Sequence, residues 1–357
     1  MTRYVNSIIN DTVSQEKSQF FVYPTIGYRP ETGVEFGLSP LYVYYAKQDT
    51  TNRLSEVNAY SFVTLNGQYG LRVNHALYSD QDKWFFLGDL DFEKFPLKYY
   101  GIGNNVPENN IALVDAVQIR IKERVLRRVF QDFYIGLETD LRSLSNVSFE
   151  DPEDNAQEVD FDLPFGAEGT TNFGLGLGFV YDERHNVLNE RNAIFSELAL
   201  INYNPFWSSS VKYQTITTDS RIFKSIGKRD VLAAQLLGEF NFAGDIPFNQ
   251  LSYLGGENIM RGYFRGRFRD RNQIAFQVEY RFLPLNLGFT DRIGATLFTG
   301  VGEVFDHWDE IQLNNMKWSA GAGLRLLLFQ QKDVYLRFDY AFTPDDSNFY
   351  ISIGEAF

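Results

Sequence analysis

The sequence contains no cysteine, only three histidines and no long apolar run. The lack of cysteine excludes disulfides, Fe–S clusters and thiolate-bound zinc, and three scattered histidines leave little for a metal site or a catalytic triad. No stretch approaches about 18 consecutive apolar residues, which excludes a helical membrane protein. A basic excess is also missing, because 46 Asp and Glu oppose 33 Lys and Arg for a net charge of −13. We therefore expect no nucleic-acid partner, no metal and no cofactor.

The start of the chain lacks a recognisable signal peptide. Met1 is followed by neither a basic segment nor an apolar run. Either the protein is cytosolic, or this is a mature chain with a Met in front, and the strand pattern described next favours the second option. We expect residues 1–19 to be a polar tail and residues 20–357 to form a single domain.

Aromatic residues are abundant, since 33 Phe, 21 Tyr and 4 Trp make up 16% of the chain. They recur in segments that alternate between apolar and polar positions, most clearly in residues 333–342. There the even positions are all apolar: Val334, Leu336, Phe338, Tyr340 and Phe342. The odd positions are mainly polar: Asp333, Tyr335, Arg337, Asp339 and Ala341. Residues 273–282 and 117–124 repeat the pattern, which predicts strands with one apolar face.

Sixteen such segments follow one another along the chain. They lie near residues 20–28, 34–46, 56–67, 71–79, 84–95, 112–128, 132–145, 172–183, 193–203, 210–225, 231–243, 273–282, 292–305, 318–329, 333–342 and 348–357. Long connections (96–111, 146–171, 204–209, 244–272 and 306–317) contrast with short ones (227–230 and 330–332). An even strand number with long loops at one rim and short turns at the other is typical of outer-membrane barrels.

The apolar faces of these strands are expected to point outward. In a soluble protein they would have to fill the interior of a sixteen-stranded ring, which is too wide to close over apolar side chains. Closure also removes the edge strands that an open sheet would expose. The predicted fold class is therefore all-β: a sixteen-stranded antiparallel transmembrane β-barrel with both ends on the periplasmic side. A soluble all-β adhesin or lectin is the disfavoured alternative.

An arginine-rich segment, residues 255–271, stands out in this acidic chain. It reads GGENIMRGYFRGRFRDR, and its five arginines all occupy odd positions: Arg261, Arg265, Arg267, Arg269 and Arg271. Continued alternation places those from Arg265 onward on the same face as Gln277, Glu279 and Arg281, the predicted lumen. A guanidinium removed from water needs a carboxylate partner. We therefore expect an inward-folded loop between strands eleven and twelve, paired with Glu239 or Glu279; the alternative is an exposed basic loop that binds lipopolysaccharide or nothing.

The same segment resembles a known signature. LGGENIMRGY, with Arg261-Gly262-Tyr263 after the eleventh strand and five strands to follow, is similar to the signature of the outer-membrane barrel superfamily that contains BamA and the two-partner secretion transporters. It looks like the bacterial surface antigen branch. Further support comes from residues 27–33 (GYRPETG), 95–104 (FPLKYYGIGN) and 181–184 (YDER). The resemblance covers residues 20–357.

The resemblance implies a lock inside the barrel, formed by Gly255, Gly256, Arg261, Gly262, Tyr263 and Glu279. Arg261 would contact acidic groups on the twelfth and thirteenth strands, and Glu279 matches the first of these. Gly300 stands where much of the family has Asp, so Arg261 is expected to be one partner short. The periplasmic POTRA domains of BamA are missing from the sequence, which implies partner subunits in their place.

The resemblance further implies weak pairing between the first and last strands, which would allow a lateral opening. Pro24 removes a ladder donor from the first strand, and Gly354 weakens the last; ordinary strand irregularity is the alternative. The candidate seam residues are Pro24, Gly27, Tyr28, Ile351, Ile353 and Gly354. The last strand ends on an aromatic residue and looks like an outer-membrane sorting signal, carried by Phe349 and Phe357.

Two other motifs are not expected to form sites. The glycine run 174–178 lies within a strand with no helix after it, so it is no phosphate loop. The acidic stretch 150–162 does not match EF-hand spacing and is expected to be a solvated loop. Since no catalytic motif stands in a plausible context, an enzyme is not expected.

The expected function is to assist insertion or translocation of outer-membrane proteins or lipids. The expected partners are outer-membrane lipids or lipopolysaccharide, together with periplasmic or outer-membrane partner subunits. The alternative is a passive pore, or a membrane anchor for a partner protein. Inward charges of both signs would suit a water-filled lumen: Arg120, Lys122, Arg124, Glu138 and Asp140.

Overall fold

The computed structural model describes residues 17–94, 96–152, 161–185, 189–285, 287–329 and 333–357. Most of the predicted tail, and residues 153–160 of the acidic stretch, lie outside these ranges. The described residues contain no α-helix, and none of their helical turns is long and apolar enough to cross a bilayer.

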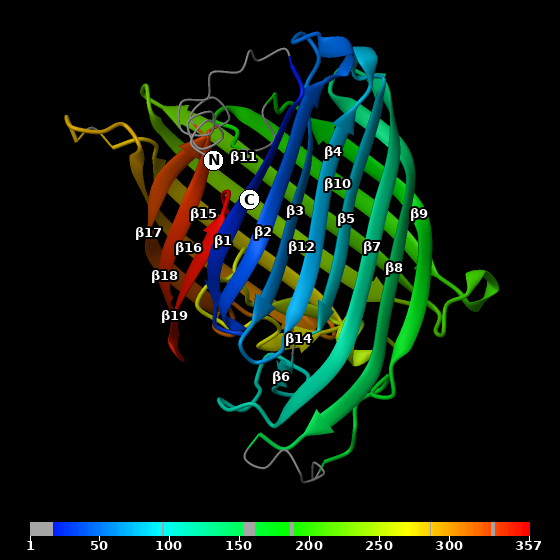
Figure 1. The fold of residues 1–357 in the computed structure, drawn as a ribbon. Helices are drawn as coiled ribbons and strands as arrows, with labels where there is room; N and C mark the ends of the chain where they lie inside the picture. The colour runs from blue at the N-terminus through cyan, green and yellow to red at the C-terminus, as the bar shows by residue number, and fades with distance from the viewer. Residues whose placement is uncertain (1–16, 95, 153–160, 186–188, 286, 330–332) are drawn as a thin grey trace.

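Within the described ranges, sixteen main strands form one closed antiparallel sheet (Figure 1). They are β1 (Gln19–Arg29), β2 (Gly33–Tyr45), β3 (Leu54–Thr64), β4 (Tyr69–Tyr78), β5 (Trp84–Lys94), β7 (Ala112–Phe130), β8 (Phe133–Glu150), β9 (Thr170–Asp182), β10 (Ala193–Tyr203), β11 (Tyr213–Ile226), β12 (Asp230–Phe242), β15 (Asn272–Phe282), β16 (Ile293–Phe305), β17 (Lys317–Phe329), β18 (Val334–Phe342) and β19 (Ser347–Ile353). Each predicted segment overlaps one of these strands. The short β6 (Leu97–Tyr99) pairs with the start of β7 beyond β5.

The two rims of the barrel differ, as the connection lengths predict. One rim, called here the short-turn rim, carries tight turns such as residues 131–132 and 227–229. The other, the long-loop rim, carries the connections 95–111, 151–169 and 243–271. The short-turn rim also holds the start of β1 and the end of β19, because an even number of antiparallel strands returns the chain to the rim where it began.

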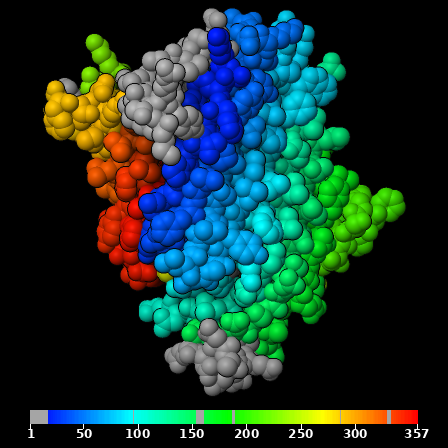
Figure 2. Space-filling model, in the orientation of Figure 1, coloured from blue at the N-terminus to red at the C-terminus, as the bar shows by residue number. Residues whose placement is uncertain are grey.

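The outer face of the barrel is apolar and its inner face is polar. On β18, Phe338, Tyr340 and Phe342 are 39–55% exposed. Arg337 and Asp339, at the alternating positions, are each 2% exposed. A strand places alternate side chains on opposite faces, so in a closed sheet one set faces outward and the other faces inward. The predicted apolar-out orientation is confirmed. Figure 2 shows part of this outer face, with β19 (red) beside β1 (blue).

The strand β19 is shorter than predicted. It ends at Ile353 instead of Phe357, because Gly354 turns the chain with a φ of +86° and donates its N–H to the Tyr335 carbonyl at 2.9 Å. The following residues run along the inner face, where Arg281 Nη2 donates to the Phe357 carbonyl at 3.1 Å. The Phe357 ring therefore lies outside the alternating strand that the sequence predicts.

Candidate functional site

The arginine segment, residues 255–271, belongs to the connection between β12 and β15. Near its end it forms β14 (Phe268–Asp270), which pairs in a small hairpin with β13 (Ser252–Leu254) just before the segment. Glycine is required at Gly255, where φ is +105° and a Cβ would overlap the Phe264 carbonyl oxygen. Gly262, with φ +109°, packs so closely that a Cβ would lie 2.6 Å from Thr343 Cγ2. The glycines of the signature thus allow a tight backbone path around Arg261.

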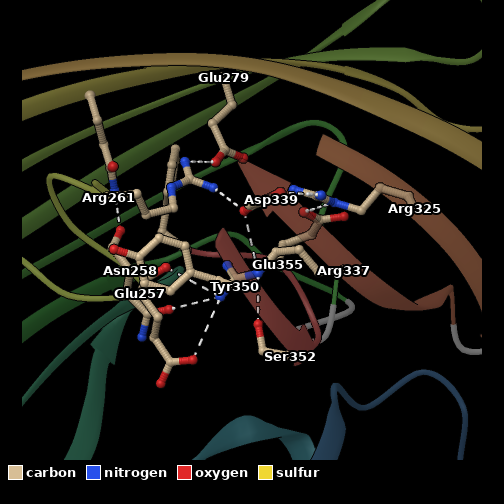
Figure 3. Close-up of polar contacts among 12 residues, drawn as sticks. Glu257, Asn258, Arg261, Glu279, Arg325, Arg337, Asp339, Tyr350, Ser352 and Glu355 are labelled. Atoms are coloured by element: carbon tan, nitrogen blue, oxygen red, sulfur yellow. Dashed lines mark hydrogen bonds and ion pairs between the residues drawn. The ribbon is translucent and has the colours of Figure 1, made fainter. Parts of the chain in front are cut away.

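Arg261 is 1% exposed and contacts two carboxylates and an aromatic ring. Its Nη2 pairs with Glu279 on β15, and its Nη1 lies 2.6 Å from Asp339 Oδ2 on β18. The Phe298 ring of β16 lies beneath the guanidinium, with 3.6 Å between Cζ and the ring centroid. Two charge-assisted pairs and a cation–π contact are among the strongest interactions open to a buried arginine. Figure 3 shows Arg261 reaching both Glu279 and Asp339.

These contacts belong to a closed ring of alternating charges, which we call the buried charge ring. Glu279 also holds Arg281 at 2.7 Å, and Asp339 also holds Arg325 at 2.6 Å. Glu355, just after β19, joins both outer arginines, at 2.9 Å to Arg325 and 3.9 Å to Arg281. The ring members are Arg261, Glu279, Arg281, Glu355, Arg325 and Asp339. The side chains of all six are at most 4% exposed, so loss of one leaves uncompensated charge in the interior.

Sequence reasoning missed the second partner of Arg261. The thirteenth-strand position, Gly300, holds no carboxylate; a Cβ there would lie 3.3 Å from Met260 Sδ, so Met260 takes up the space beside it. Asp339 supplies the second carboxylate from β18 instead. The sequence signal for this partner was the position of Asp339 on the polar face of residues 333–342.

A second cluster forms around Glu257 of the arginine segment. Its carboxylate lies 2.7 Å from Arg72 Nη1 on β4, 3.9 Å from Arg29 on β1 and 4.0 Å from Arg337 on β18. Burial alone would raise the pKa of Glu257, but these arginines lower it to about 2. Glu257 is therefore ionised at neutral pH and connects strands on both sides of the β1–β19 junction.

Backbone groups of the arginine segment also connect the two sides of the β1–β19 junction. The Gly262 N–H donates to the Tyr350 hydroxyl at 3.0 Å, and Asn348 Nδ2 donates to the Gly262 carbonyl at 2.6 Å, both on β19. The Arg265 N–H donates to Glu31 Oε1 at 2.6 Å, in the turn after β1. One short stretch of chain thus bonds to both sides of the junction.

The β1–β19 junction itself has little backbone pairing. Among the described residues the two strands register only at Tyr28↔Ile351, whereas β1 pairs with β2 from Gln19 to Arg29. The Tyr28 and Phe349 rings stack across it, with centroids 3.8 Å apart. Of the other seam candidates, Gly27 adjoins Ile351, since a Cβ there would lie 3.2 Å from its carbonyl oxygen. Ile353 is the last residue of β19 and Gly354 turns the chain after it, while Pro24 pairs with Leu38 of β2.

The four remaining arginines of the segment do not share one face, contrary to the predicted parity. Arg265 binds Glu93 of β5 at 2.7 Å, and Arg267 lies over the Tyr100 ring. Arg269 donates to the Phe248 carbonyl at 3.2 Å, and Arg271 binds Asp306 at 2.8 Å. The parity fails because only residues 268–270 of the segment are extended and Gly266 turns the chain before them with a φ of +73°.

Two other candidate residues, Tyr263 and Glu239, make contacts of their own. Tyr263 is buried and packs edge-on against Phe268, with 5.1 Å between ring centroids, and the Gly256 N–H donates to its carbonyl at 3.0 Å. Glu239, offered as a partner of the arginine segment, instead lies 3.4 Å from Arg142 of β8. In the described part of the chain, no group of three or more metal-ligating side chains could hold an ion.

Comparison with known proteins gives a family match for most of the chain. A family model described as the Omp85 superfamily domain matches residues 64–357. The chain belongs to the Omp85 superfamily. The match includes the arginine segment and every strand of the buried charge ring, so this Omp85 chain is an outer-membrane β-barrel by family as well as by fold.

Two solved structures share the fold. BamA from Haemophilus ducreyi lacking POTRA domains 1–3 gives a TM-score of 0.58 at 13% identity, covering 95% of this chain and 70% of that one. CdiB from Acinetobacter baumannii gives 0.56 at 11% identity, covering 96% and 60%. The Omp85 barrel described here thus spans less than two thirds of CdiB. No curated protein matches it.

Proposed function

We propose that this Omp85 barrel assists insertion or translocation of outer-membrane proteins or lipids, together with partner subunits. The observation that supports it most is the β1–β19 junction, where the described residues register at one pair, whereas β1 and β2 pair along the length of β1. A junction with few backbone hydrogen bonds opens at lower cost than a complete ladder. It could then offer strand edges to a client or disturb the bilayer beside it.

In this proposal the arginine segment stays in the lumen and controls the opening. Glu257, Gly262 and Arg265 bond to both sides of the junction, and the buried charge ring holds the segment in place. Movement of the segment would release both sides at once. The chemistry is non-covalent, and we propose no catalytic residue, metal or cofactor.

The proposed placement sets the long-loop rim outside and the short-turn rim toward the periplasm. The apolar outer face would contact membrane lipids, and the outer rim would contact lipopolysaccharide. Partner subunits would bind at the periplasmic side and deliver clients. Phe349, on the exposed face of β19, is proposed to take part in sorting the chain to the membrane, with Phe357 as the second candidate.

A passive pore or a membrane anchor for a partner protein is the second candidate. Charges of both signs on the inner face favour it. They pair across strands, as Lys122 does with Glu138 at 2.9 Å and Arg124 with Asp89 at 2.9 Å. Paired charges line a hydrated lumen without requiring any motion at the junction.

The deciding experiment measures the folding rate of an unfolded outer-membrane client into liposomes that contain this protein, against empty liposomes. Acceleration that is lost in Arg261→Ala supports an insertase. If neither protein accelerates folding while both conduct ions in planar bilayers, the barrel is a pore. Absence of both effects, with or without a periplasmic extract, would leave only the anchor.

A further inference from the structure

A pair of ionisable side chains lies on the outer face of the barrel. His75 Nε2 of β4 lies 2.9 Å from Glu123 Oε2 of β7. Both side chains lean over Gly88 of β5, the strand between them, where a Cβ would overlap the two polar groups. Figure 1 shows these strands side by side. We propose that the pair marks an interface, within the membrane, between two copies of this chain.

The outward direction of Glu123 follows from the alternation along β7. Lys122 and Arg124 are 6% and 4% exposed and form ion pairs on the inner face. Ile121 and Val125 are 37% and 39% exposed on the outer face. Glu123 lies between them at the same parity, and its side chain is 37% exposed. The carboxylate therefore faces the lipid instead of the lumen.

The pair lies midway between the two edges of the membrane. On β4, His75 shares the outer face with Tyr69, which is 41% exposed and an even number of residues away. The ring centroids of Tyr69 and Phe92, near one end of β5, are 5.9 Å apart, and Trp84 begins β5 at its other end. Such aromatic residues mark the two membrane–water interfaces of a barrel. Because Gly88 is midway between Trp84 and Phe92, the pair lies near the centre of the hydrocarbon layer.

At this depth a bilayer offers hydrocarbon and neither headgroups nor bulk water. His75 and Glu123 bond to each other, but a carboxylate has acceptor positions on both of its oxygens. Ionisable side chains that face lipid are costly, and within a membrane they mark functional surfaces. A protein surface that supplies a hydrogen-bond donor would remove the exposed carboxylate from the lipid. The pair therefore indicates a protein partner that is itself embedded in the membrane.

The outer face beside the pair carries the donor that Glu123 needs. Thr139 of β8 is registered with Glu123 and shares the outer face with Leu137, which is 66% exposed. The Thr139 hydroxyl donates to the Glu123 backbone carbonyl at 3.5 Å, a long bond that can be exchanged. A donor and an acceptor that lie side by side are complementary to the same pair after a two-fold rotation. A two-fold axis between β7 and β8 would place each Glu123 carboxylate against the Thr139 hydroxyl of the second copy.

The inference uses the membrane placement that fold and family give, and it does not depend on insertase activity. The strands β2, β3, β4 and β5 separate β7 from β1 in the sheet. A dimer joined at β7 and β8 would therefore leave the β1–β19 junction of each copy uncovered.

Energy transfer between labelled barrels in liposomes tests the interface. Because the chain has no cysteine, Asp309→Cys, in the exposed turn between β16 and β17, can carry a donor or an acceptor dye. Donor-labelled and acceptor-labelled barrels are mixed at decreasing protein-to-lipid ratio. We expect saturable association that weakens at least tenfold in Thr139→Val and in the double variant His75→Leu with Glu123→Leu.

The matched control removes a different polar pair from the outer face. Ser196 of β10 and Ser220 of β11 hydrogen-bond at 2.7 Å, and Ser196→Ala with Ser220→Ala should leave association unchanged. Energy transfer no greater than chance at every ratio, or equal association in all variants, would overturn the proposal.

The unfolding midpoint separates an interface from a purely structural ion pair. At a dilution where the wild type is monomeric, an interface predicts that His75→Leu with Glu123→Leu keeps or raises the midpoint, because polar groups leave the lipid face. A midpoint that falls while association stays unchanged would show that the pair serves only the monomer, which contradicts the proposal. Should this double variant fail to fold, Thr139→Val, which keeps the shape of the side chain, carries the test.

Cross-linking in the native outer membrane identifies the occupant. Leu137→Cys, two residues before Thr139 on the same outer face, carries a maleimide–diazirine cross-linker. A product that contains two copies of this chain supports the proposal. A product with a different protein, or no product at all, would rule out a second copy as the occupant of this face.

Discussion

The strand β1 has two neighbours, and they hold it in different ways. Toward β2 the ladder runs from Gln19↔Val43 to Arg29↔Gly33. Toward β19 the registered pair among the described residues is Tyr28↔Ile351, supported by one aromatic stack. The β1–β2 pairing, which we call the wall, is a continuous ladder of backbone hydrogen bonds. The β1–β19 junction is closed mainly by side chains, many of them reaching the arginine segment.

This difference shows where the barrel can change shape. A complete ladder spreads its backbone hydrogen bonds over many residues, so no single side chain decides whether it holds. A junction closed by ion pairs depends on a few specific residues, so it can be weakened without unfolding the wall. The predictions that follow test this difference between the β1–β2 ladder and the β1–β19 junction.

The largest effect is expected for Arg261→Ala. Glu279 and Asp339 would each lose a buried partner, and breaking such a pair costs about 3–5 kcal/mol. We expect a lower midpoint of heat-induced unfolding, faster trypsin cleavage among Arg265, Arg267 and Arg269, and a higher ion leak in planar bilayers.

The matched control for this prediction is Arg127→Ala, which removes an exposed arginine. Glu279→Ala should loosen the segment in the same way as Arg261→Ala. If conductance and trypsin protection stay unchanged in both ring variants, the arginine segment is not held by the ring.

A smaller effect is expected for Glu355→Gln. It opens the buried charge ring at its third carboxylate, but Arg325 keeps Asp339 and Arg281 keeps Glu279. Loss of a hydrogen bond between charged groups is worth about 2 kcal/mol. The unfolding midpoint should fall by less than in Arg261→Ala, while Asp309→Asn, in an exposed loop, should leave it unchanged. A midpoint equal to wild type would show that Glu355 is not part of a working ring.

The smallest effect is expected for Glu257→Gln, because the Glu257 side chain is the most exposed of the three at 17%, and the effect depends on pH. The pKa of Glu257 is lowered from 4.5 to about 2 in the folded barrel. Its contribution to stability is therefore fully present above pH 4.5 and is lost as the pH falls toward 2. The difference in unfolding midpoint between wild type and Glu257→Gln should be constant near neutral pH and shrink across that window. A difference that grows on acidification would contradict the assignment.

The strands could be predicted from the sequence because alternation is a local property. Each of the sixteen segments carries its own apolar face, so its existence and facing follow without knowledge of its neighbours. The pairing of Arg261 with Glu279 was accessible for a similar reason, since the signature and the polar face of β15 are both visible in the sequence.

Asp339 and Glu355 could not be assigned as partners in the same way. Their contacts join β15, β17, β18 and the residues after β19, and such contacts depend on the register and on where the chain turns. Gly354 determines where the chain turns after β19, because its left-handed φ directs Glu355 toward Arg325. The shared face predicted for Arg265 to Arg271 failed because alternation holds only where the backbone is extended.

The most direct test of the account compares two engineered disulfides in the client-folding assay. The chain has no cysteine, so Tyr28→Cys with Ile351→Cys tethers the junction without competing thiols. Ile26→Cys with Phe36→Cys tethers a registered pair in the wall between β1 and β2. The account predicts that the oxidised junction pair loses acceleration of client folding, that reductant restores it, and that the wall pair has no effect. Full acceleration with the junction tethered would contradict the claim that this junction opens.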